Sequence, residues 1–127
     1  MQNPALNSPP APEDAPAAPY PRVRTVRVWV DSANQPHALP EQVDVSGGGV
    51  LIQFLLLTNG WAFPAEAAIT VQDGGTQFPC AAWTLAPQQA ALLDADTSPG
   101  IFNYTIHVVH TGTGQRLRLD PTIRNDF

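Results

Sequence analysis

Two histidines, His107 and His110, stand three residues apart in the segment SPGIFNYTIHVVHTGTG and are the first candidates for chemistry. Imidazole nitrogens bind transition metals and act as general bases near neutral pH. The segment has the alternation of a β-strand, in which side chains at i and i+3 point to opposite faces. The two rings therefore cannot share a metal in a regular strand, and we expect structural roles for both.

Cys80 is the only cysteine, so the chain forms no internal disulfide, and a reducing, cytoplasmic location fits this composition. A blue-copper site needs a thiolate close to two imidazoles. Cys80 is followed by AAWTLAPQQ, which holds no histidine, and the only methionine is Met1. We therefore expect Cys80 to be a small buried apolar residue, and we predict no metal ligands and no cofactor.

The sequence also lacks the motifs of acid–base and nucleophilic catalysis. Asp94 and Asp96 could form a carboxylate pair, but they lie in a polar, turn-rich stretch, where we expect solvated side chains. No Gly-x-Ser-x-Gly elbow surrounds a serine, and the SGGGV segment lacks the lysine of a phosphate-binding loop. We therefore predict no catalytic residues and a protein that is not an enzyme.

Charge and hydropathy exclude two further classes. The 127 residues carry a net charge of −5, and the only cluster of basic residues is Arg22, Arg24 and Arg27. Nucleic-acid-binding domains need a broader basic face, so we predict no nucleic-acid partner. The longest apolar run, Val50–Leu57, is too short to span a membrane, and the start of the chain lacks the pattern of a secretory signal. We therefore expect no membrane association. All six basic residues other than histidine are arginines, which is typical of GC-rich bacterial coding.

The elements that would position these side chains are short strands. Residues 1–21 hold seven of the fourteen prolines and predict an extended Pro/Ala-rich arm, whereas residues 22–127 form one domain. Alternation and turn residues predict about seven strands in that domain, near 23–30, 42–46, 50–57, 67–72, 76–85, 101–109 and 115–123. The fold class is therefore an all-β, antiparallel Greek-key β-sandwich.

Three details of this prediction depend on local composition. The run 50–57 is apolar on nearly every position, which is typical of a strand covered on both faces. Trp83 is a candidate for the core. Residues 86–96, APQQAALLDAD, favour a short helix or a turn, because Pro87 suits a first helical turn and the residues after it are good helix formers.

Three segments, NGWAFPAEAAITV, FPC and PGIFNYTIHV, resemble the strands of immunoglobulin-like and cupredoxin-like β-sandwiches. The resemblance implies the fold but no copper, because the cupredoxin ligand motif is absent. Immunoglobulin-like domains often form a tyrosine corner at such a strand start, but Phe102 occupies the matching position and Tyr104 comes two residues later. The ending LRLDPTIRN is similar to the Asp-Pro-x-Ile ending of AidA-like and inclusion-body proteins, which are β-sandwiches without a defined activity.

These observations favour a non-enzymatic protein that works by protein–protein interaction or self-assembly, with a protein partner or a second copy of the chain. The alternative is a small-ligand or carbohydrate-binding module that stacks its ligand on Trp29, Trp61 and Tyr104. A metal-binding cupredoxin-like protein is the third class.

Overall fold

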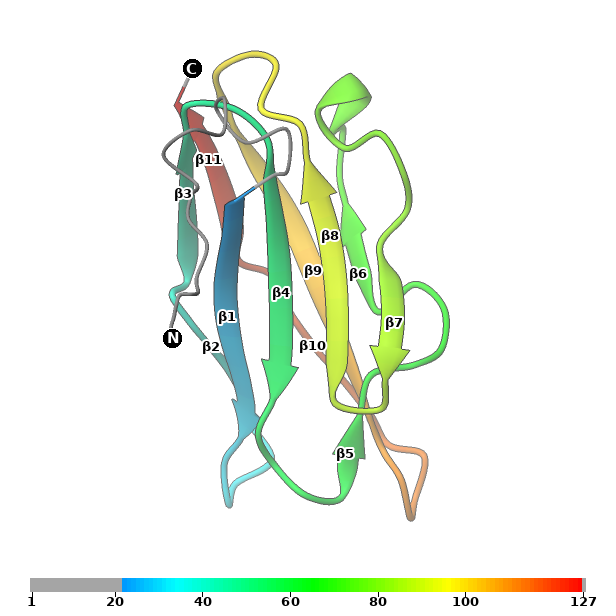
Figure 1. Ribbon diagram of the computed structural model, residues 1–127. Coiled ribbons are helices and arrows are strands. Elements are labelled where there is room, and N and C mark those ends of the chain that lie inside the picture. Colours follow the sequence, from blue (N-terminus) through cyan, green and yellow to red (C-terminus); the bar gives the residue numbers. More distant parts are fainter. Residues whose placement is uncertain (1–21, 127) are drawn as a thin grey trace, which may run out of the picture.

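The computed structural model describes residues 22–126, so the arm predicted for residues 1–21 lies outside the described residues, as does Phe127. The described part is all-β, with two mixed sheets packed face to face (Figure 1). It holds eleven strands and a 3₁₀ turn at Gly75–Gln77, where the sequence predicts about seven strands. The prediction of an all-β fold is confirmed. Most strand pairs are antiparallel, as predicted, but each sheet also contains one parallel pair, so both sheets are mixed.

The first sheet has the strand order β2-β1-β4-β8-β7. Its strands are β1 (Arg22–Val30), β2 (Pro36–Leu39), β4 (Val50–Leu56), β7 (Trp83–Ala86) and β8 (Gln89–Asp94). β1 and β4 run parallel, and the other pairs are antiparallel. A bulge interrupts the pairing of the edge strand β7 with β8.

The second sheet is built around the longest strand, β9 (Gly100–His110). The strands β5 (Trp61–Ala62) and β6 (Ile69–Val71) pair with one edge of β9, and β10 (Arg116–Leu119) and β11 (Thr122–Asp126) pair with the other. β3 (Gln42–Ser46) completes the sheet by pairing in parallel with β11. The segment predicted as a single closing strand forms two strands, β10 and β11. Pro121 separates them, because proline cannot donate a hydrogen bond to the neighbouring strand.

The core lies between the sheets and follows from strict alternation. Every second residue of β4, from Val50 to Leu56, is buried. These side chains meet β9, where Tyr104, Ile106 and Val108 are buried in the same way. Phe54 and Tyr104 join the two layers, with ring centroids 5.7 Å apart. Alternation with period two therefore places the strongest strands of both sheets at the centre.

Residues 86–96, predicted as a short helix or turn, form a turn at Pro87–Gln88 and the strand β8. The helix prediction is wrong because helix propensity is worth only tenths of a kcal/mol per residue. Pairing with β4 outweighs it, since Ala90 and Leu92 enter the core along the whole register from Asp94 to Gln89. Tertiary packing decides this segment.

The buried hydroxyl of Tyr104 gives a test of the packing. Tyr104 has no exposed surface, and its hydroxyl has no hydrogen-bond partner, so it makes no tyrosine corner. Burial also raises the pKa of Tyr104. Because a buried hydroxyl without a partner costs free energy, Tyr104→Phe should raise the free energy of unfolding by about 1 kcal/mol in urea denaturation. As the matched control, Phe54→Ala should lower it by about 3–5 kcal/mol. A loss of stability in Tyr104→Phe would show that the hydroxyl has a partner.

Candidate functional site

The outward side of the first sheet is the most unusual surface of the described residues. Val26, Val28 and their even-numbered neighbours face the core, so the alternate residues point outward. The register aligns these outward residues across the sheet, for example Thr25 with Gln53 and Gln53 with Ala91. We call this surface the outer face; it comprises Val23, Thr25, Arg27, Trp29, His37, Leu39, Leu51, Gln53, Leu55, Leu57, Trp83, Gln89, Ala91 and Leu93.

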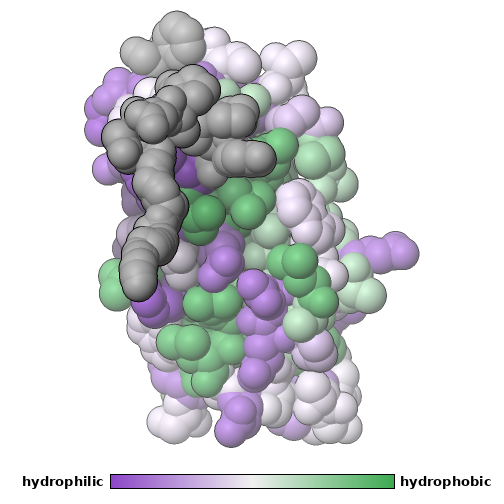
Figure 2. Space-filling view, in the orientation of Figure 1, coloured by the Kyte–Doolittle hydropathy of each residue, from purple (hydrophilic) through white to green (hydrophobic). Residues whose placement is uncertain are grey.

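Exposed apolar side chains are concentrated on this sheet. Six large hydrophobic residues of the described chain are exposed, and five of them belong to its strands or follow them directly: Val23, Leu39, Leu57, Trp83 and Leu85. Only Ile101 lies on the second sheet. Figure 2, in which the first sheet faces the reader, shows several apolar patches on this face with polar side chains between them. Single exposed hydrophobic residues are ordinary, but a grouped set on one sheet marks an interaction surface.

The outer face carries almost no charge. Arg27 is its only Arg or Lys, and none of its residues is Asp or Glu, although the chain has eleven acidic residues. The nearest carboxylate along the chain is Asp31, directly after β1, which lies 2.8 Å from His37 Nε2. The hydrogen bond with His37 holds the pKa of Asp31 below its usual value. Because the nearest carboxylate lies at its edge, the face repels another acidic protein less than a surface rich in Asp and Glu would.

Of the predicted stacking residues, the structure exposes only one in part. Tyr104 is fully buried and Trp61 is 6 % exposed, so neither presents a ring to a ligand. Trp29 is half-buried and stacks on His37, with ring centroids 5.3 Å apart. The three residues therefore do not form one stacking site. Trp83, a predicted core residue, is instead 40 % exposed on the edge strand β7, because its register partner Ala91 is on the outer face.

The two candidate histidines are separated, as strand parity requires. His110 closes the β9–β10 hairpin, where its Nδ1 accepts hydrogen bonds from the backbone N–H groups of Gly112 and Thr113. Its ring also contacts Trp61 edge to face. His107 lies on the outward side of β9 opposite Arg118 of β10. The described residues contain no group of three or more His, Cys, Asp or Glu side chains suited to a metal.

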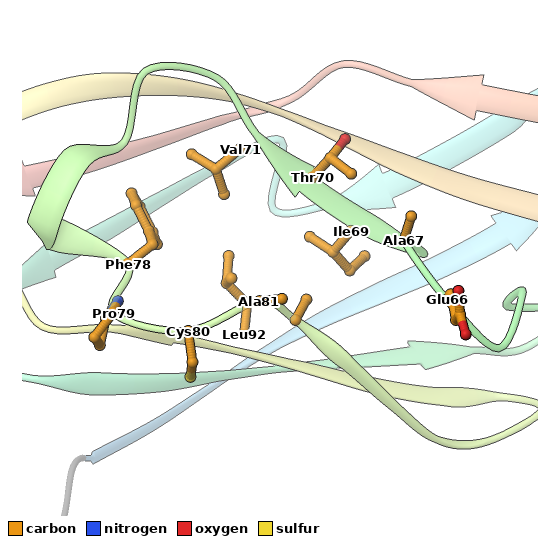
Figure 3. A pocket seen from close by; sticks show the side chains of 11 residues that line it. Glu66, Ala67, Ile69, Thr70, Val71, Phe78, Pro79, Cys80, Ala81 and Leu92 are labelled. Atoms are coloured by element: carbon orange, nitrogen blue, oxygen red, sulfur yellow. The ribbon is translucent and has the colours of Figure 1, made fainter.

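A pocket of about 590 Å³ opens between β6 and residues 78–82, at the side of the molecule where both sheets end (Figure 3). Ile69, Val71, Phe78 and Leu92 give it an apolar lining, and Glu66 is its only charged residue. Cys80 also lines it and is exposed, so the prediction that this thiol is buried is wrong. The strand predicted over 76–85 begins only at Trp83, which leaves Cys80 in a surface loop.

The prediction for two acidic residues is also wrong. Asp94 and Asp96, expected in solvent, are 0 % and 2 % exposed. The polar, turn-rich sequence around them suggests a surface loop, but Asp94 is the last inward-facing residue of β8. Alternation continued from Ala90 and Leu92 would have predicted its burial. The outer face had a similar signal, because the run 50–57 is apolar at odd as well as even positions.

The chain matches no protein-family model, and no curated protein is significantly similar to it. Within residues 22–126 there is no helix with the length and apolar composition needed to cross a bilayer. Function must therefore be argued from the surfaces and clusters described above.

The environment of His107 gives a test of the pairing between β9 and β10 in the second sheet. Burial lowers the pKa of His107, and the charges of Arg118 and Arg116 lower it further. The imidazole should therefore titrate below about 6.5 in an NMR titration. Arg118→Gln removes the nearer charge and should raise the pKa of His107, while burial keeps it below the usual value. A His107 pKa above about 6.5 in the unmodified protein would contradict this arrangement.

Proposed function

We propose that this protein acts by binding rather than by catalysis, and that it self-associates through the outer face of the first sheet. The observation that carries the proposal is that four of the six exposed large hydrophobic residues lie on this one face: Val23, Leu39, Leu57 and Trp83. Removing such side chains from water is the main favourable term in protein association. Leu51 and Leu55 of β4, and Leu57 directly after it, point outward. This strand is therefore suited to be covered by other protein on both of its faces.

A second copy suits this face because the face carries little charge. Two copies of a protein with net charge −5 repel each other over most of their surfaces. The outer face reduces this cost, since it has one cation, Arg27, and its nearest carboxylate along the chain is Asp31, at the end of β1. Depletion of charge is also what distinguishes the buried centre of protein interfaces from other surface. An isologous pair of outer faces would pack as sheet on sheet, as the two sheets within each copy already do.

The size of the face indicates a weak association. Five strands at about 4.8 Å spacing and about seven residues at about 3.3 Å rise span roughly 550 Å². Interfaces of this size, below about 600 Å² per partner, belong to transient complexes. The expected state is therefore a monomer–dimer equilibrium that depends on concentration.

The two-layer arrangement also supports an immunoglobulin-like or cupredoxin-like relationship, which we propose at the level of fold. Two packed sheets around an aromatic and β-branched core are common to these families. A fold of this kind hosts many activities, so the relationship adds no activity to the proposal.

A charge placed in the outer face tests the proposal. The mass of the full chain, measured by light scattering over a dilution series, should rise toward twice the monomer mass at high concentration. Leu55→Arg would bury an unpaired charge at the centre of the interface and should weaken dimerisation at least tenfold, by about 1.4 kcal/mol or more. Val23→Arg, at a position already 52 % exposed, should do the same without a risk to folding.

The matched control is Ile101→Arg, which adds the same charge at an exposed position of the second sheet and should leave dimerisation unchanged. Deletion of residues 1–21 tests whether this N-terminal segment, and not a second copy, covers the outer face. A dimer that forms only after this deletion would show that the N-terminal segment covers the face. A monomer at all concentrations, with or without the segment, would overturn the proposal.

A further inference from the structure

A buried polar cluster lies at the end of the sandwich where the β8–β9 connection meets the 3₁₀ turn (upper end in Figure 1). Asp94 ends β8, Asp96 follows it, and Asn125 comes from β11 of the other sheet. Their exposed fractions are 0 %, 2 % and 2 %. Gln77 of the 3₁₀ turn, 6 % exposed, completes the cluster. Four polar side chains from both sheets therefore meet out of contact with solvent.

Each of three side chains is held by one atom and leaves an oxygen without a partner. Asp94 Oδ1 accepts hydrogen bonds from Asp96 N and from Asn125 Nδ2, both at 2.9 Å, while Asp94 Oδ2 has no donor. Asp96 Oδ2 accepts from the N–H of Gly48, and Asp96 Oδ1 has no donor. Asn125 uses its amide nitrogen in the cluster, and its Oδ1 has no donor.

Gln77 fixes the position of this group from the outside. Its Oε1 accepts from Asn125 Nδ2 at 3.1 Å and from the backbone N–H groups of Thr97 and Ser98. Its Nε2 donates to the hydroxyls of Thr97 and Ser98. Such outer hydrogen bonds are the ones that orient ligands around a bound ion.

The buried negative charge has no basic partner among residues 22–126. The three ion pairs of this part of the chain involve neither Asp94 nor Asp96. An uncompensated buried carboxylate costs several kcal/mol, so two of them require a proton or a cation. One proton on Asp94 would supply a single donor to the remaining oxygens, which leaves at least one without a partner.

We propose that Asp94, Asp96 and Asn125 form a binding site for a hard divalent cation of the calcium type. Two carboxylate oxygens and an amide oxygen are the donors that Ca²⁺ prefers, and backbone carbonyls and water complete its six to eight ligands in proteins. The site contains no nitrogen or sulfur ligand, so it does not suit zinc or copper. Because Asp94 belongs to the first sheet and Asn125 to the second, the cation would fasten the two sheets together at this end.

Thermal unfolding of the full chain tests the site. The protein is freed of divalent ions with EDTA and then unfolded in EDTA, in CaCl₂, in MgCl₂ and in NaCl of equal ionic strength. For a dissociation constant of about 0.1 mM, about 5 mM Ca²⁺ should raise the midpoint of unfolding by about 10 °C. Equilibrium dialysis should find one Ca²⁺ per chain. NaCl should give no such shift, which excludes screening of the acidic surface.

Isosteric variants separate this site from other carboxylates. Asp94→Asn and Asp96→Asn should each lose the Ca²⁺-dependent shift, whereas Asp44→Asn, an exposed position on β3, should keep it. In EDTA, Asp94→Asn should unfold at a higher temperature than the unmodified protein, because it removes a buried charge and adds a donor for the unpartnered oxygens. Dialysis of the unmodified protein and Asp44→Asn still decides the question if a cluster variant fails to fold. Absence of stoichiometric Ca²⁺, or a shift retained in both cluster variants, would overturn the proposal.

Discussion

The packing of β4 against β9 is the contact on which the rest of the structure depends. Val50, Ile52, Phe54 and Leu56 form one continuous buried row, and Phe54 meets Tyr104 across the two layers. β4 also pairs with β1 and β8, and β9 pairs with four other strands. Burying this row against β9 fixes which side of each neighbouring strand faces inward. The outer face and the buried polar cluster are both consequences of that choice.

The two surfaces of the first sheet show how one strand can carry two roles. The even-numbered side of β4 forms the core, and its odd-numbered side continues the same apolar chemistry outward. An apolar outward side adds nothing to the core and exposes hydrocarbon to water, which costs free energy until another surface covers it. Association between copies would recover that cost. The acidic remainder of the surface would then restrict contact to this one face.

Period-two alternation predicts the all-β class, most of the strand positions and the separation of His107 from His110. It fails where local chemistry and tertiary pairing disagree. Residues 89–94 have helix-forming composition and are a strand because β4 supplies a partner. Asp94 and Asp96 look solvated because their neighbours are polar, but Asp94 faces inward at the end of β8 beside Asn125 of β11, and Asp96 lies buried beside it. The parallel pairs were not predictable, since they join segments whose distance along the chain hides their contact.

The central claim is that copies of this protein meet through the outer face of the first sheet. The most direct measurement is a dilution series of two-dimensional amide NMR spectra, which reports on every strand at once. Concentration-dependent shifts should be confined to the outward residues of β1, β2, β4, β7 and β8 and be absent from β9, β10 and β11. Shifts centred on the second sheet, or spectra that do not change with concentration, would contradict the central claim.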